Sequence, residues 1–131
     1  MSWYWGKRSK RVRDELHSDL ILVVDHVLLR SPFDLTLTEG YRGVRDQTAY
    51  FEAGLSELRF PFSQHNRMPA HAVHIHPYPV TFEVVDEDNE WLARYHVLAG
   101  LMVCASGDLG IGLRWLGLTS LRDYAHWELP K

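Results

Sequence analysis

Three histidines and one aspartate are the residues of this chain whose types could together support hydrolysis. His65 and His74 lie nine residues apart near the middle of the chain, and Asp123 precedes His126 by three residues near its end. A metal ion that activates water needs about three protein ligands, an open coordination position and a nearby carboxylate that accepts the proton. These four residues supply that set if the fold brings them together. The alternative is that they only reflect a composition in which 8 of 131 residues are histidine.

His74 and His76 lie in a segment rich in strand-forming residues, 73–80. Residues two apart in a strand share a face, so His74 and His76 are expected to point the same way. His74 would then be a metal ligand and His76 a neighbour that orients it or contacts substrate. The alternative is a strand with a polar outward face. Asp123, just before the expected strand 126–129, would act as general base for the attack and then as general acid for the leaving amine.

The hydrophobic pattern predicts the elements that must position these side chains. Ser9 and Ser18 are the expected caps of the first two helices, and the prolines of segment 73–80 fit an edge strand or a strand end. Helices are expected over 9–16, 18–29, 44–53 and 91–106, and strands over 35–38, 73–80, 113–115 and 126–129. Because the helices come first and the strands are scattered later in the chain, we expect an α+β fold. It would be a small antiparallel sheet with helices packed on one side, in a single domain over 1–131.

The composition narrows the class of protein. The formal net charge of −3 does not favour nucleic acid as a partner, and the basic cluster in 7–13 is interpreted as a solvated helix face. The single cysteine, Cys104, excludes an internal disulfide. No apolar run approaches the roughly 18 to 20 residues of a membrane span, and no signal peptide is visible. We therefore expect a monomer made in the cytoplasm, which another component must release if its substrate lies outside.

Several short motifs, taken in order, resemble one family. The segments 63–65 (Ser-x-His), 72–78 (Ala-Val-x-Ile-x-Pro-Tyr) and 123–129 (Asp-x-x-His-Trp-Glu-Leu) look like those of the zinc peptidases that include D-Ala-D-Ala carboxypeptidases and L-alanyl-D-glutamate endopeptidases. Segment 38–42 (Thr-Glu-Gly-Tyr-Arg) resembles the first strand of that family and the arginine after it, and 113–115 resembles its penultimate strand. The resemblance implies the hedgehog and D-Ala-D-Ala-peptidase type of fold, and bacteriophages commonly encode such proteins as endolysins.

The resemblance also implies roles for individual residues. His65 and His126 would be zinc ligands, and Asp123 the catalytic base. Arg42 would bind and polarise the scissile carbonyl or its oxyanion, which suits a fixed cation. Ser63 would help to orient the site.

One position departs from the family pattern. The family has an aspartate as its second zinc ligand, where this chain has His74. Three neutral imidazoles also form a catalytic zinc site, so the hypothesis is that zinc is still bound, by His65, His74 and His126. Glu128 is expected to be a structural residue or to contact the metal ligands, and not to take part in catalysis.

These observations predict a zinc-dependent peptidoglycan peptidase of the phage endolysin type. It would hydrolyse an amide bond of the stem peptide, most simply L-Ala–D-Glu, in the periplasm or cell wall after release. One alternative is a D-Ala-D-Ala carboxypeptidase, which uses the same residues. Another is a degenerate zinc protein that binds the cell wall without cleaving it, which the histidine at position 74 motivates.

Overall fold

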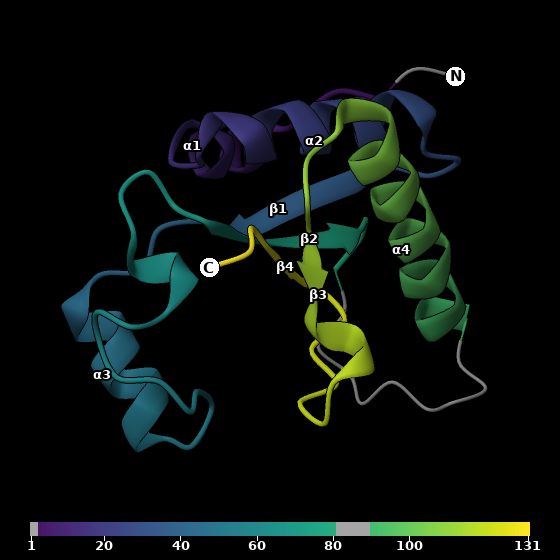
Figure 1. Ribbon diagram of the computed structural model, residues 1–131. Helices are drawn as coiled ribbons and strands as arrows, with labels where there is room; N and C mark the ends of the chain where they lie inside the picture. Colours follow the sequence, from purple (N-terminus) through teal and green to yellow (C-terminus); the bar gives the residue numbers. More distant parts are fainter. Residues whose placement is uncertain (1–2, 81–89) are drawn as a thin grey trace.

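The computed structural model describes residues 3–80 and 90–131, and it has an α+β architecture (Figure 1). The expected fold class is therefore confirmed. Within the described residues, no helix is both long enough and apolar enough to cross a bilayer. The helices are α1 (Lys7–Asp14), α2 (Ser18–Arg30), α3 (Val44–Glu52) and α4 (Glu90–Leu109), the strands β1 (Leu35–Glu39), β2 (Ala72–Pro77), β3 (Arg114–Trp115) and β4 (His126–Glu128), and the 3-10 turns η1 (Gln64–Asn66) and η2 (Leu116–Leu118).

The two N-terminal helices begin at residues other than the expected caps. Helix α1 starts after Gly6, and Ser9 is buried inside it, where its hydroxyl accepts a hydrogen bond from the Leu37 amide at 3.0 Å. Ser9 thus joins α1 to β1 and is not a cap. Helix α2 is capped by His17, whose Nδ1 accepts from the Asp19 amide at 3.0 Å. A serine signals a cap only when its backbone lies outside the helix, which the pattern of residue types does not specify.

The four strands form one antiparallel sheet in the order β1-β2-β4-β3. Strand β2 is therefore central, and the interpretation of 73–80 as an edge strand is wrong. Its alternative, a strand end, holds because Pro77 is the last residue of β2 and Pro79 lies beyond it. The structure thus avoids losing ladder hydrogen bonds in the middle of the sheet, as proline requires.

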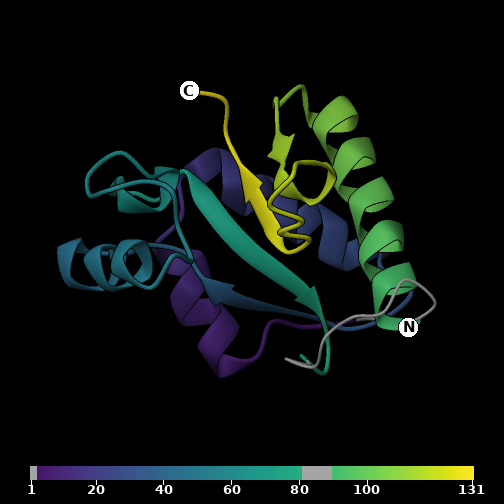
Figure 2. The same ribbon diagram turned by 90° about the horizontal axis from the view of Figure 1, so that it is seen from below.

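The core lies between one face of the sheet and the helices α2 and α4, which pack against each other (Figures 1 and 2). On β2, Val73 and Ile75 are fully buried toward this core, whereas His74 and His76 alternate with them. The expected shared face of the two histidines is confirmed. The most completely buried core side chains come from α2, β1, β2, α4 and β4: Leu20, Val23, Val24, Val27, Leu37, Val73, Ile75, Leu98, Met102 and Trp127.

Helix α3 lies away from this core, on the other side of the molecule from α4 (Figure 2). It is connected to the sheet through Gly40, which follows β1. A Cβ atom on Gly40 would lie 3.1 Å from the Leu16 side chain and 3.2 Å from the Val12 carbonyl oxygen. The close approach of α1 thus favours glycine here, and the Gly40 carbonyl lies 2.7 Å from Nδ1 of His65.

Candidate metal centre

His65 is held rigidly by the turn η1. The Ser63 hydroxyl accepts from the His65 amide at 3.2 Å, and the Ser63 amide donates to Oδ1 of Asn66 at 3.0 Å, so the turn is capped from both sides. The imidazole is 1% exposed, and its Nδ1 lies 2.7 Å from the Gly40 carbonyl oxygen. Ser63 therefore fixes the backbone at His65, and its role in orienting the site during a reaction stays a prediction.

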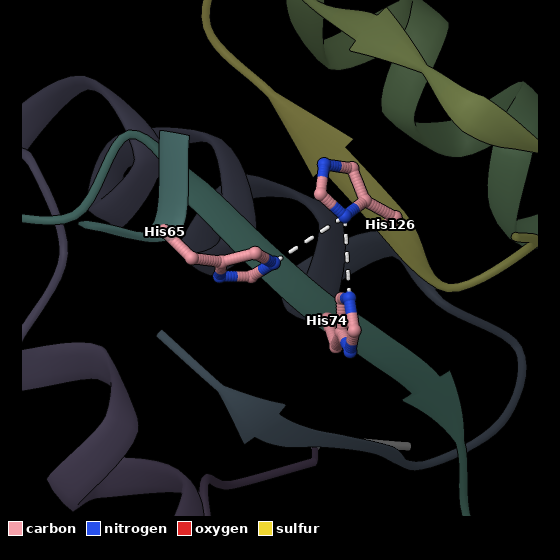
Figure 3. A group of neighbouring side chains, drawn as sticks. All are labelled: His65, His74 and His126. Carbon is pink, nitrogen blue, oxygen red and sulfur yellow. Dashed lines mark hydrogen bonds between the residues drawn. The ribbon is translucent and has the colours of Figure 1, made fainter. Parts of the chain in front are cut away.

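His74 and His126 lie directly opposite each other on neighbouring antiparallel strands, β2 and β4. Opposed residues of an antiparallel pair share a face of the sheet, so the two imidazoles project together on the face away from the core. The η1 turn adds His65 from the side (Figure 3). Three segments that are distant in the sequence thus place their imidazoles at one point.

The ligand atoms form a compact triangle. The Nε2 of His65 is 3.3 Å from Nδ1 of His126, the Nε2 of His74 is 3.2 Å from that Nδ1, and all three atoms lie within 4.8 Å of one another. Zinc–nitrogen bonds of about 2.0–2.1 Å in a tetrahedral site separate ligand nitrogens by about 3.3 Å. Two edges of the triangle already match that spacing, so the three histidines could hold a metal ion.

The hydrogen bonds behind His65 and His126 fix which ring nitrogens carry protons. The Gly40 carbonyl can only accept, so Nδ1 of His65 donates to it. The Nε2 of His126 lies 2.7 Å from Oε1 of the buried Glu128 and donates to that carboxylate. In their neutral forms, both rings therefore turn an unprotonated nitrogen toward each other. Two lone pairs that face each other repel, and a shared cation relieves that repulsion.

Burial favours the neutral form of two of the three rings, His65 and His74. It lowers the pKa of His65 well below 6.5, helped by the neighbouring His74 and His126. Burial likewise lowers the pKa of His74 to about 4, although Asp123 opposes the shift. Neutral imidazole is the form that binds metal, so His65 and His74 are in the metal-binding form near neutral pH.

Asp123 lies at the open side of the triangle. Its Oδ2 is 3.7 Å from Nε2 of His74 and 3.8 Å from Nδ1 of His126, and its side chain is 39% exposed. The four residues that could together support hydrolysis are thus all brought to one place. The Asp123 carboxylate thus lies beside two of the three histidines, and a general base has to reach the reacting group from such a position.

Two comparisons relate this site to known proteins. The sequence matches the family described as phage L-alanyl-D-glutamate peptidase over residues 1–123. This chain belongs to that family. Among solved structures, the Serratia marcescens L-Ala D-Glu endopeptidase ChiX is similar with a TM-score of 0.79 at 26% identity, covering 97% of this chain and 90% of that chain. A search of curated proteins gives no match. The resemblance stated from the motifs is confirmed.

In this family member, Arg42 is a buried cation in the wall of the site. Its Nη1 donates to Oε1 of Gln47 at 2.9 Å, its Nη2 donates to the Glu39 carboxylate, and its guanidinium lies over the Tyr50 ring at 4.2 Å. The side chain is therefore fixed at one orientation. Its role toward a scissile carbonyl stays a prediction.

Sequence reasoning did not assign a role to Glu39. Its Oε1 lies 4.0 Å from Nε2 of His65, so a second carboxylate flanks the histidine triangle. A register shift in β1 after Leu37 pairs Glu39 with His74 and turns it to the site face. The sequence signal was the Glu-Gly-Tyr-Arg run, which by itself does not reveal the shift.

His76 contacts the site less directly than expected. Its ring centroid is 6.4 Å from that of His74. Its Nε2 lies 2.9 Å from the Thr38 hydroxyl, and its Nδ1 lies 2.6 Å from the Tyr95 hydroxyl. Both ring nitrogens are therefore occupied by bonds that join β1, β2 and α4. A contact of His76 with substrate stays a prediction.

The site opens into a cavity of about 510 Å³. His65, His74, His126 and Asp123 line it, and its walls come from the loop after α3 and from the segment that contains β3 and η2. Pockets of this volume accommodate several residues of a peptide or a small ligand. The site is thus accessible to a substrate larger than a single amino acid.

Proposed function

We propose that this protein is a zinc-dependent endopeptidase that hydrolyses the L-Ala–D-Glu bond of peptidoglycan stem peptides. The observation that carries the proposal is the convergence of His65, His74 and His126, whose ligand nitrogens lie within 4.8 Å of one another beside the Asp123 carboxylate. The family and the similar endopeptidase support the choice of bond. Release to the cell wall after lysis and a monomeric state remain predictions.

The donor set fits zinc. Three imidazole nitrogens with two edges of 3.2 and 3.3 Å match a tetrahedral site that has one position left for solvent or substrate. His65, His74 and His126 would hold a zinc ion, which would supply Lewis acidity toward the scissile carbonyl and toward water near neutral pH. Glu128 holds the His126 ring and increases its basicity as a ligand.

The remaining residues carry the proton and the developing charge. The Asp123 carboxylate accepts a proton from the attacking water and then delivers it to the nitrogen of the leaving amine, so one group serves both half-reactions. Arg42, fixed by Glu39 and Gln47, stabilises negative charge on the carbonyl oxygen as the tetrahedral intermediate forms. The cavity holds the stem peptide on either side of the bond.

The test is turnover of purified peptidoglycan and of synthetic stem peptides, with fragments identified by mass spectrometry. The zinc-loaded protein should release fragments that begin with D-Glu, and treatment with a chelator followed by dialysis should abolish the release. Loss of only the terminal D-Ala would instead identify a D-Ala-D-Ala carboxypeptidase. Saturable binding of peptidoglycan by the zinc-loaded protein without any fragment would identify a binding protein and refute the peptidase.

A further inference from the structure

The wall of the cavity contains a guanidinium that makes no hydrogen bond within the described residues. The cavity is lined by Arg42, Arg114 and Lys131. Arg42 is buried and bonded to Glu39 and Gln47, whereas the Arg114 side chain is 57% exposed and makes no hydrogen bond within the described part of the chain. Arg114 is thus a guanidinium that is available to a ligand.

The backbone that carries Arg114 is firmly placed. Arg114 lies opposite Glu128 in the pairing of β3 with β4, and the next pair, Trp115 and Trp127, stacks its rings at 5.4 Å. The Trp115 indole nitrogen also donates to the Tyr124 carbonyl at 2.9 Å. The guanidinium is therefore presented to the cavity from a rigid strand rather than from a flexible loop.

Arg114 is close to the metal ligands through a single intermediate residue. Its Nη1 is 3.8 Å from Oε2 of Glu128, and Oε1 of the same carboxylate is 2.7 Å from His126. A separation of 3.8 Å is too long for a hydrogen bond, so Glu128 orients Arg114 by charge and leaves its donors free. A substrate anion could accept these donors while the carboxylate stays bound to His126.

The proposed substrate has an anion at the corresponding place. D-Glutamate in a stem peptide is linked onward through its side-chain carboxyl, so its α-carboxylate stays free on the carbon that bears the scissile nitrogen. That nitrogen is the leaving group that Asp123 protonates, and Asp123 lines the same cavity as Arg114. A guanidinium matches a carboxylate in both charge and fork geometry.

We propose that Arg114 is a specificity-determining residue that binds the free α-carboxylate of the D-glutamate next to the scissile bond. This inference rests on the proposed function, because it names the group of that substrate which the cavity recognises. It implies that the enzyme distinguishes stem peptides in which this carboxylate is free from those in which it is amidated.

The experiment compares two synthetic peptides, L-Ala–γ-D-Glu–L-Lys and its amide L-Ala–γ-D-isoglutaminyl–L-Lys, each capped at the amino terminus. The zinc-loaded protein should cleave the carboxylate form with a kcat/KM about fivefold higher, the effect of a partly exposed ion pair. In Arg114→Gln this preference should disappear, and in Arg114→Lys part of it should return. Arg11→Gln, an exposed cation on α1 outside the cavity, changes the net charge equally and should keep the preference.

The preference is the readout because general damage to the fold lowers both rates and leaves their ratio unchanged. Equal rates on the two peptides in the unmodified protein, or a preference that survives in Arg114→Gln, overturns the proposal while the proposed function stands. If neither peptide is cleaved, the proposed function fails, and the dissociation constants of both peptides are then compared by calorimetry. A carboxylate preference in binding that Arg114→Gln removes still supports the subsite, and equal binding overturns it.

Discussion

The Nε2 of His65 and the Nδ1 of His126 face each other across 3.3 Å, and the other nitrogen of each ring is hydrogen-bonded, to the Gly40 carbonyl and to Glu128 respectively. This arrangement is unfavourable for two neutral imidazoles in isolation and favourable around a cation. The site is therefore organised for a cation that neutralises this repulsion.

The first prediction concerns the third ligand. The purified protein should bind one zinc ion per chain. His74→Ala should bind zinc much more weakly than the unmodified protein, because two imidazoles alone cannot complete the site. Zinc is measured by competition with a chromophoric chelator. His26→Ala removes a histidine of α2 that contacts Asp108 of α4, outside the cavity, and this variant should bind zinc normally. Unchanged zinc affinity in His74→Ala would exclude His74 as a ligand.

Asp123 should matter for turnover and not for metal binding. Asp123→Asn keeps the size of the side chain and removes its ability to accept a proton, so kcat should fall by about 10²- to 10⁴-fold. Zinc stoichiometry should remain at one per chain. Asp14→Asn, an exposed aspartate on α1, serves as the matched control. Full activity in Asp123→Asn would show that another group takes the proton.

Glu128 should act through His126 on metal affinity. Glu128→Gln replaces the charged acceptor of the 2.7 Å bond by an amide, and zinc affinity should fall by about 10- to 100-fold. Activity at saturating zinc should recover largely, which distinguishes a loss of metal from a loss of chemistry. Glu90→Gln changes an exposed glutamate that pairs with Arg94 and should leave zinc affinity unaltered. Equal zinc affinities for Glu128→Gln and the unmodified protein contradict this role.

Arg42 should lower the barrier rather than tighten substrate binding. Arg42→Lys keeps the charge but cannot reach Gln47 and Glu39 together, so kcat should fall by about 10²-fold with a smaller change in KM. Arg13→Lys disturbs a comparable ion pair, with Asp25, outside the cavity and controls for a general effect of replacing a paired arginine. A change confined to KM would assign Arg42 to binding alone.

The stability of the metal-free protein should fall as the pH drops from about 6.5 toward 4. The folded protein keeps His74 and His76 neutral because burial lowers the pKa of each to about 4, whereas the unfolded chain takes up protons near pH 6.5. The unfolded state thus binds more protons in this window, and the free energy of unfolding decreases by up to about 1.4 kcal/mol per pH unit for each such histidine.

Urea unfolding in the presence of a chelator, repeated at pH 7, 6 and 5, measures this slope. In His76→Gln the slope should become shallower, because one of the histidines that is neutral in the folded protein is gone. A free energy of unfolding that stays constant over this range would contradict neutral, buried histidines.

The sequence by itself determined the parts of this protein that depend on local pattern. Periodicity placed the four helices and four strands within a few residues, and alternation put His74 and His76 on one face of a strand. The order of the short motifs identified the family, because that order is a property of the chain and not of its contacts. Local pattern did not distinguish Ser9 from a cap, since capping depends on where the backbone leaves the helix.

Only the tertiary structure decided how these parts meet. It made β2 a central strand, aligned His74 with His126, and shifted the β1 register so that Glu39 turned toward the site. It also placed the free guanidinium of Arg114 beside Glu128. Each of these depends on pairings between segments far apart in the chain, and the period of two within a strand constrains which side chains share a face but not which strand lies beside it.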